Sequence, residues 1–290
     1  MQGDVRAGQL VLIATPLGNL SDLSDRAKHV LSTATVLCCE DTRRTRALLS
    51  AISADTSPKR LWAVHDHNEV AQTGAVLDLV ASGHVVGVVT DAGMPGIADP
   101  GSRLVAAAHD RGLSVSVIPG PSAAISALVV SGLPTERFIF EGFLPRKGKE
   151  RAQRLDALRF EQRTTVVFEA PGRTHQTLVE FAEVLGAHRP ATLVREITKK
   201  FETVTRATLG ELATLTTHEE VRGEVVLVIG PGEPETISDE VIDQAILRGL
   251  GSGERLKDVA RAVAQRFELD QRHTYDRARE LRVLSQGEQG

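Results

Sequence analysis

The chain has 290 residues, of which 41% are hydrophobic and 25% are charged, and its net charge is −4. This length allows two domains with cores of their own, and the composition is typical of a globular protein. A negative net charge excludes attraction to nucleic acid over the whole surface, so any such binding would need local basic patches. No apolar run approaches the roughly 18 residues of a membrane span, and no signal peptide pattern is visible. We therefore expect a cytoplasmic protein without a membrane partner.

The first half of the chain alternates between strand-like and helix-like patterns. Helical spacing separates most of the apolar segments, and the first helix is expected to begin after the cap residue Ser24. Such alternation predicts parallel strands joined by right-handed crossovers. The expected strands cover residues 9–14, 36–40, 61–65, 84–90 and 114–118.

Two adjacent cysteines, Cys38 and Cys39, lie within one of these apolar segments. Neighbouring residues of a strand point to opposite faces of a sheet. We therefore expect two buried thiols rather than a disulfide or a metal site.

The second half repeats the alternation with one difference. A helix is expected over residues 122–130, ended by Gly132, and the segment beginning at Phe201 follows its predecessor too closely for a helical crossover. The second sheet should therefore be partly antiparallel. Its expected strands cover residues 138–144, 164–169, 192–197, 201–205 and 224–229.

Proline and glycine mark the expected domain boundaries. Pro119-Gly120-Pro121 interrupts the chain between the two halves, and a linker over 230–234 precedes a segment with only helical patterns. The predicted fold class is α/β, with two α/β domains, 8–119 and 120–232, followed by a helical extension, 237–290.

The loop from Asp91 to Gly101 is the most informative segment. It leaves the carboxyl end of a buried strand, carries carboxylates, and is rich in glycine and proline. Ligands of open α/β sheets bind at such strand ends. Asp99 and Pro100 are expected to cap and begin the following helix.

Other motifs also lie at the ends of expected strands. The glycine spacing matches neither a dinucleotide fingerprint nor a P-loop, which argues against NAD and ATP. The motifs are Pro16-Leu17-Gly18-Asn19, Gly120-Pro121-Ser122-Ala123, Glu141-Gly142-Phe143-Leu144-Pro145, Arg195-Glu196-Ile197-Thr198-Lys199-Lys200 and Gly223-Glu224-Val225.

Taken in order over roughly residues 8 to 232, the motifs resemble those of the ribosomal RNA small subunit methyltransferase I family, within the tetrapyrrole methylase superfamily. Met94 departs from that pattern, because the family more often has threonine there. The segments that carry the resemblance are 15–20, 40–43, 65–69, 91–95, 119–122, 133–134, 140–145 and 195–199.

The resemblance implies two α/β domains of the tetrapyrrole methylase type with S-adenosyl-L-methionine in the cleft between them. It also implies a homodimer, and 2′-O-methylation of a cytidine ribose in the decoding region of 16S rRNA in the small ribosomal subunit. It assigns no role to the helical extension, which could be an auxiliary RNA grip or a structural appendage. The expected cofactor-binding residues are Pro16, Gly18, Asp91, Ala92, Gly93, Pro95, Ile97, Ser122, Ala123, Phe143 and Leu144.

Methyl transfer from a sulfonium requires that the protein align a ribose hydroxyl and ease the loss of its proton. The sequence does not single out one residue for this role. His65-Asp66-His67 provides two metal ligands at most, so no metal site is expected. The titratable candidates are His65, Asp66, Glu141, Glu196 and Lys199.

Two basic clusters are expected to contact RNA phosphates, although a run of charges is usually just a solvated surface. Aromatic residues make up only 3% of the chain, which favours a folded RNA recognised through phosphates and shape. The first cluster is Arg43, Arg44 and Arg46. The second is Arg146, Lys147 and Lys149, followed by Arg151 and Arg154.

Two alternative functions are left open by the sequence. One is a methyltransferase of the same fold that acts on a tetrapyrrole or a protein side chain. The other is a non-enzymatic module associated with the ribosome. The basic clusters argue against a tetrapyrrole, because a macrocycle calls for a more apolar site entrance.

Overall fold

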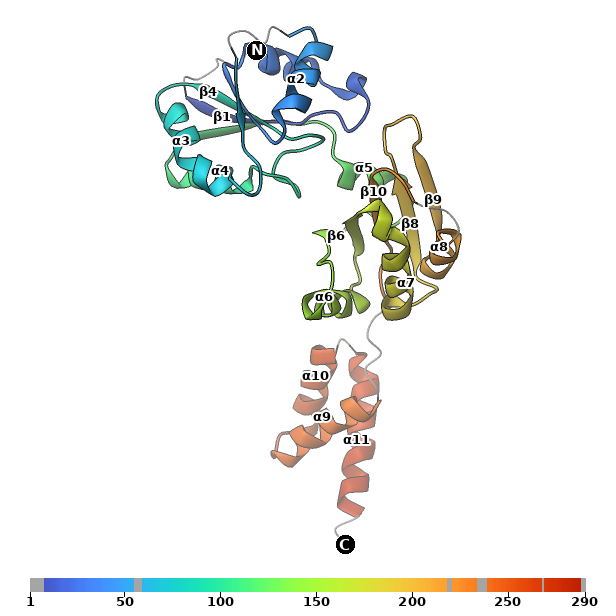
Figure 1. Cartoon of the computed structure of the whole chain (residues 1–290). Coiled ribbons are helices and arrows are strands. Elements are labelled where there is room, and N and C mark those ends of the chain that lie inside the picture. Colours follow the sequence, from blue (N-terminus) through green and yellow to red (C-terminus); the bar gives the residue numbers. More distant parts are fainter. Residues whose placement is uncertain (1–7, 55–58, 218–220, 234–238, 268, 288–290) are drawn as a thin grey trace. The chain divides into compact units, whose positions relative to one another are not determined.

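The computed structural model describes residues 8–54, 59–217, 221–233, 239–267 and 269–287. The chain divides into two compact units, the first extending to Glu233 and the second beginning at residue 234. Each unit is described by itself (Figure 1).

The first sheet of the first unit is wholly parallel, in the order β3-β2-β4-β1-β5. This confirms the prediction from the alternating patterns. Parallel pairing places the carboxyl ends of neighbouring strands at one edge. The strands are β1 (Gln9–Ile13), β2 (Val36–Cys39), β3 (Arg60–Ala63), β4 (Val85–Val89) and β5 (Ser114–Ile118).

Helices cover both faces of this sheet. Helices α1 (Asp25–Thr33) and α2 (Thr42–Ala51) pack on one face, and α3 (Glu69–Ala81) and α4 (Ser102–Asp110) pack on the other. The Ser24 side chain accepts a hydrogen bond from the Ala27 amide, so the predicted cap of α1 is confirmed. Cys38 and Cys39 are buried free thiols in the cores of opposite faces.

The second sheet is mixed, in the order β6-β7-β10-β8-β9. Strands β6 and β7 are parallel, whereas β10 is antiparallel to both β7 and β8, and β9 is antiparallel to β8. The predicted antiparallel component is confirmed. The strands are β6 (Phe138–Phe143), β7 (Thr164–Glu169), β8 (Pro190–Arg195), β9 (Thr203–Thr208) and β10 (Val225–Ile229).

Side chains alternate across the second sheet. In β10, Val226 packs with helix α5 (Ala123–Val130) on one face, while Leu227 packs with the helices on the other. Leu17, from the loop after β1, joins the α5 cluster and thereby ties the first sheet to the second. The helices on the other face are α6 (Lys149–Arg159), α7 (Thr174–Leu185) and α8 (Leu209–Leu215).

The start of α4 differs from the sequence prediction. The helix begins at Ser102, and its N-cap is Gly101 with φ at 130°, so the predicted cap at Asp99 and helix start at Pro100 are wrong. The carboxylate of Glu69, at the start of α3, accepts hydrogen bonds from the amides of Gly101 and Leu104 instead. A tertiary contact has replaced the local cap, and the Asp99 carboxyl is left for another role.

The second unit contains three helices among its described residues: α9 (Asp239–Gly251), α10 (Leu256–Phe267) and α11 (Gln271–Gly287). Ile246, Val259, Val263, Ala278 and Leu281 form a core of their own. The helical patterns predicted for this segment are confirmed within the described range. None of the helices described in either unit combines the length and apolar character needed to cross a membrane.

Candidate functional site

Loops from both sheets of the first unit line a cavity of about 420 Å³, here called the main cavity. The first sheet contributes residues that follow β1, β2 and β4, and these are Leu17, Glu40, Arg44, Asp91, Ala92, Ala98 and Asp99. The second sheet contributes α5, the ends of β6 and β7 and the start of β10, mainly through Ala123, Phe143, Phe168, Glu169, Gly223 and Glu224.

Backbone hydrogen bonds fix the loops on the first-sheet side. Thr15 and Gly93 exchange two such bonds, at 2.9 and 3.1 Å, which joins the loops after β1 and β4. Gly93 has φ at 85°, and a Cβ there would lie 3.2 Å from the Leu17 side chain. Glycine suits this backbone conformation, and any larger residue would also make the Leu17 side chain shift.

An ion pair lies on the wall of the main cavity. Arg44 Nη1 in α2 donates to Asp91 Oδ2 at 2.9 Å. The Glu40 carboxylate accepts a bond from the Asp91 amide at 3.4 Å. Arg44, which the sequence assigned to the RNA-binding cluster, is thus engaged at the cavity.

Carboxyl groups give the main cavity its electrostatic character. Burial, together with Glu40 and other nearby carboxylates, raises the pKa of Asp99 to about 7, and burial also raises the pKa of Glu40. A site that crowds carboxylates in this way favours a bound cation, which would relieve their repulsion.

Two smaller spaces adjoin the main cavity. A space of about 210 Å³, here called the side cavity, shares Arg44 and Asp91 with it and is otherwise lined by Thr15, Pro16, Gly18, Leu20, Thr45, Leu48 and Thr90. A recess of about 40 Å³ shares Leu17, Ala92, Asp99, Ala123 and Phe168 with the main cavity and adds Gly93, Met94, Ile97 and Ser122.

The residues expected to bind the cofactor are distributed over these three spaces. Asp91, Ala92, Ala123 and Phe143 line the main cavity. Pro16 and Gly18 line the side cavity, whereas Gly93, Ile97 and Ser122 line the recess. Pro95 and Leu144 are buried and line none of the three.

A charged cluster at the edge of the site contains two of the catalytic candidates. Lys199 Nζ lies 3.0 Å from Glu196 Oε1 and 3.1 Å from Glu224 Oε1. The amide of Glu224 and the ammonium of Lys199 lower the pKa of Glu196. Although partial burial acts the other way, its two carboxylate partners raise the pKa of Lys199. Both groups are therefore held in their charged forms.

The backbone of this cluster is strained. Glu196 and Thr198 have φ at 51° and 65°, which is uncommon for residues other than glycine. A Cβ on Gly18 would overlap the Lys199 side chain, and a Cβ on Gly223 would overlap the Glu196 carboxylate. Such strain, held by close packing, is typical of functional segments.

None of the five catalytic candidates lines any of the three spaces, and the remaining three lie away from the charged cluster. His65 and Asp66 follow β3, and Glu141 forms an ion pair with Arg154 at 3.0 Å. His65 and His67 have ring centroids 6.1 Å apart. Among the described residues, no group of three or more potential ligands is arranged to hold a metal ion.

The two basic clusters differ in how many of their residues form ion pairs within the protein. Arg43 pairs with Asp41, Arg44 pairs with Asp91, and Arg46 is exposed. Arg146, Lys147 and Lys149 are exposed at the start of α6, and no described residue forms an ion pair with them. Arg151, by contrast, is buried and bonds to Glu180 and Thr177, so it contributes to the core of the second sheet.

Sequence reasoning missed several residues of the main cavity. Glu40 and Gly223–Val225 lie in motifs that were recognised without being assigned to the site, and Asp99 was assigned to a helix cap. The segment 168–171 spans the end of β7 and the residues after it, so the rule that ligands bind at strand ends predicts it.

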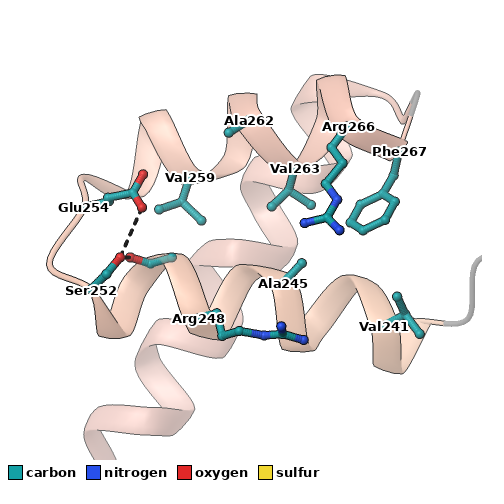
Figure 2. Close-up of a pocket in the computed structure, with 11 residues that line it drawn as sticks. Val241, Ala245, Arg248, Ser252, Glu254, Val259, Ala262, Val263, Arg266 and Phe267 are labelled. Atoms are coloured by element: carbon teal, nitrogen blue, oxygen red, sulfur yellow. Dashed lines mark hydrogen bonds between the residues drawn. The ribbon is translucent and has the colours of Figure 1, made fainter.

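A separate groove of about 390 Å³ lies between α9 and α10 of the second unit (Figure 2). Arg248 and Arg266 lie along it, and the Arg266 guanidinium lies over the Phe267 ring. At one end, Ser252 donates a hydrogen bond to Glu254. The groove is lined by residues of this unit alone.

Residues 9–213 match the model of the family described as Tetrapyrrole (Corrin/Porphyrin) Methylases. The Ribosomal RNA small subunit methyltransferase I of Mycobacterium tuberculosis is 45% identical over 258 residues, which cover 89% of this chain and 90% of that protein. The protein of the same name from Synechocystis is 39% identical over 94% of this chain and 98% of its own length.

Solved structures agree on the fold. The uroporphyrin-III C-methyl transferase of Thermus thermophilus, complexed with S-adenyl homocysteine, is 24% identical with a TM-score of 0.54, and the match covers 77% of this chain and 97% of that one. A diphthine synthase is 16% identical with a TM-score of 0.59, covering 77% and 89% of the two chains. These structures show the fold alone. The family model and the relatives together show that the chain belongs to the ribosomal RNA small subunit methyltransferase I family of the tetrapyrrole methylases.

Proposed function

We propose that this protein transfers a methyl group from S-adenosyl-L-methionine to the 2′ oxygen of a cytidine ribose in the decoding region of 16S rRNA, in the cytoplasm. The observation that carries the proposal is the main cavity, in which carboxylate-bearing loops from both sheets meet in a chain of this family. Relatives named for methylation of ribosomal RNA support the RNA substrate. The choice of cytidine, of the 2′ oxygen and of the decoding region follows the family resemblance.

The walls of the main cavity fit the proposed cofactor. Leu17, Phe143 and Phe168 supply apolar surface for an adenine ring, and Glu224 can accept hydrogen bonds from hydroxyl and amino groups. Asp99 and Glu40 place negative charge where a sulfonium would neutralise it. The donor set therefore suits a ligand with one aromatic ring, several hydroxyls and a positive centre.

S-adenosylmethionine supplies a methyl group already activated by positively charged sulfur, so the protein has to position the acceptor hydroxyl and help remove its proton. Arg44 and Lys199 each have a carboxylate partner and stay positively charged, so they can stabilise negative charge that develops on the acceptor oxygen. Asp99, whose pKa is about 7, is the cavity carboxyl best matched to accept a proton near neutral pH.

The proposed RNA contacts are the exposed charges near the start of α6. Arg146, Lys147 and Lys149 have no carboxylate partner among the described residues, so their charges are available to phosphates. Arg43 and Arg46 are exposed on α2 and are proposed as further contacts.

We also propose a homodimer. Helix α5 exposes Ile125 and Val129, and the edge strand β5 exposes Val117. Exposed apolar side chains concentrated on one helix are typical of surfaces that bind another protein.

The proposed function is tested by incubating the protein with labelled S-adenosylmethionine and small ribosomal subunits that lack the modification. The proposal expects label at one cytidine 2′ oxygen. Label on a protein or a tetrapyrrole acceptor, with none on RNA, would favour the other methyltransferase hypothesis.

A further inference from the structure

Thr90 lines the side cavity, and its buried hydroxyl group has no hydrogen-bond partner in the described part of the chain. The residue is only 4% exposed. The neighbouring hydroxyls of the same cavity are both used, since Thr15 Oγ1 donates to the Thr90 carbonyl at 3.2 Å and Thr45 Oγ1 donates to the Asp41 carbonyl at 3.1 Å. A buried hydroxyl without a partner is costly, so a ligand that bonds to it gains affinity.

The size of the side cavity restricts what it can hold. Its volume of about 210 Å³ is half the 420 Å³ of the main cavity. A cavity of about 150 Å³ can hold a benzene molecule, so this space has room for a sugar or a single pyrimidine ring. Pro16, Leu20 and Leu48 provide apolar surface, while Thr90 and Arg44 provide hydrogen-bonding groups.

The Arg44–Asp91 ion pair belongs to both cavities. Molecules bound in the two cavities would therefore meet at this pair. Arg44 uses only Nη1 on Asp91, and a guanidinium has five N–H donors, so further donors can reach a second ligand.

Lys199, which follows β8 of the second sheet, packs against the part of the side-cavity wall that contains Gly18. Gly18 lies so close to the aliphatic part of Lys199 that a Cβ would overlap it. The Lys199 ammonium is in turn bound by Glu196 and Glu224. The cavity is thus preformed, which reduces the entropy lost when a ligand binds.

We propose that the side cavity receives the pyrimidine ring of the acceptor nucleotide, which enters as a single unpaired ribonucleotide turned out of the RNA. Thr90 hydrogen-bonds to this nucleotide, and Arg44 contacts it where the two cavities meet. The inference rests on the proposed function, since it assigns the methyl donor to the main cavity. Single-stranded or splayed-out nucleotides are the form in which RNA is generally read by sequence.

The test compares two threonine-to-valine variants. Thr165 in β7 is 1% exposed, and its Oγ1 also lacks a partner among the described residues, but it lines neither cavity. Thr90→Val should raise the apparent KM for small subunits about tenfold, the usual effect of removing one hydrogen bond. Thr165→Val should leave that KM unchanged. Neither variant should lower the melting temperature, because neither hydroxyl bonds to the described part of the protein.

Two further measurements separate the subsite from the cofactor site. Calorimetric titration of Thr90→Val with S-adenosylhomocysteine should give a Kd within about twofold of the unaltered protein, because the hydroxyl lies outside the main cavity. Leu20→Trp, which fills the side cavity from an exposed position, should abolish transfer to subunits and keep cofactor affinity. Thr90→Ser, which restores the hydroxyl, should recover most of the affinity for subunits.

The possible outcomes distinguish the subsite from the proposed function. Normal transfer by both Thr90→Val and Leu20→Trp would overturn the subsite and leave the proposed function standing. Parallel loss of cofactor affinity in Leu20→Trp and Thr90→Val would also overturn it, since the side cavity would then hold part of the methyl donor. If the unaltered protein transfers no methyl group to subunits, the proposed function fails and the subsite fails with it.

Discussion

The buried carboxylate of Glu69 accepts a hydrogen bond from the backbone amide of Gly101 at 3.0 Å, across 32 residues of sequence. The same oxygen accepts a second bond from the Leu104 amide at 3.1 Å. One side chain of α3 thus satisfies two amides at the start of α4 and anchors the end of the loop that carries Asp91 and Asp99. The geometry of the main cavity depends on a residue that does not line it.

Removing this carboxylate should therefore be costly. Glu69→Ala leaves two amides without their charged acceptor and opens space at a position only 2% exposed. We expect a loss of about 2–4 kcal/mol in the free energy of unfolding, measured by urea titration. Glu211→Ala, in the exposed capping box of α8, should lose only about 1 kcal/mol. Equal losses in the two variants would contradict the anchoring role of Glu69.

Asp99 should make stability depend on pH. Burial and the carboxylates of Glu40, Asp66, Asp91 and Glu224 raise its pKa from 3.8 to about 7. The folded state therefore binds a proton more tightly than the unfolded state, so the contribution of Asp99 to stability falls as pH rises from about 4 to 7. Asp99→Asn should remove the contribution of residue 99 to this pH dependence. The variant should therefore become more stable relative to the unaltered protein as the pH rises from about 4 to 7. If the difference in unfolding free energy between the two proteins is the same at pH 5 and at pH 8, the raised pKa of Asp99 is contradicted.

The same carboxyl should distinguish a cationic ligand from a neutral one. S-adenosylmethionine carries a positive sulfur, so its affinity should rise as Asp99 loses its proton near pH 7, whereas the affinity of neutral S-adenosylhomocysteine should change less. Calorimetric titrations between pH 6 and pH 8 measure both ligands, and Asp99→Asn should flatten the difference. A pH profile that is the same for both ligands would show that Asp99 does not interact with the sulfonium.

Gly223 should tolerate no side chain. Its φ is 84°, and a Cβ would overlap the Glu196 carboxylate, which also binds Lys199. Gly223→Ala should cost about 1–3 kcal/mol of stability and weaken cofactor binding, because the cluster beside the main cavity must shift. Gly172 is the matched control, since a Cβ there meets nothing within 4 Å. The prediction fails if Gly172→Ala and Gly223→Ala have the same cofactor affinity.

The charges at the start of α6 should control RNA affinity. Lys147→Glu with Lys149→Glu should weaken binding to small subunits and reduce the slope of log K against log salt by about one for each phosphate that is no longer neutralised. Cofactor affinity should not change. Lys28→Glu, on α1 where Lys28 pairs with Asp25, serves as the control for charge alone. A salt dependence that is unchanged in the double variant would exclude these lysines from the RNA interface.

The homodimer proposal is tested on α5. Val129 is 67% exposed, and Val129→Glu should shift the protein toward monomer in sedimentation experiments. Val70 on α3 is 70% exposed, so Val70→Glu provides a matched change elsewhere. A monomeric unaltered protein, or a dimer insensitive to Val129→Glu, would rule out this face.

The elements of the fold follow from the sequence because their signals are local. The apolar alternation predicted both sheets, and the short connection before Phe201 predicted antiparallel pairing, seen between β8 and β9. The adjacency of Phe168 and Val226 is not local. It arises because β10 runs antiparallel to β7, which brings the start of one strand to the end of the other.

Charged residues at the site were harder to assign from sequence. Asp99 followed by Pro100 has the pattern of a helix cap, and only the tertiary contact from Glu69 shows that α4 begins later. Arg44 lies among arginines on α2, and nothing local distinguishes it from Arg43. The structure separates them, because Arg43 turns back to Asp41 while Arg44 reaches Asp91 after β4.

The position of the methyl group tests the proposed function most directly. Small subunits lacking the modification are incubated with the protein and labelled S-adenosylmethionine, and the RNA is then digested and its nucleosides are separated. The proposed function predicts label in one 2′-O-methylcytidine of 16S rRNA. It also predicts that the Asp91→Ala variant transfers far less label and binds the cofactor far more weakly. Label on a base, or no label on RNA while the cofactor binds normally, would contradict it.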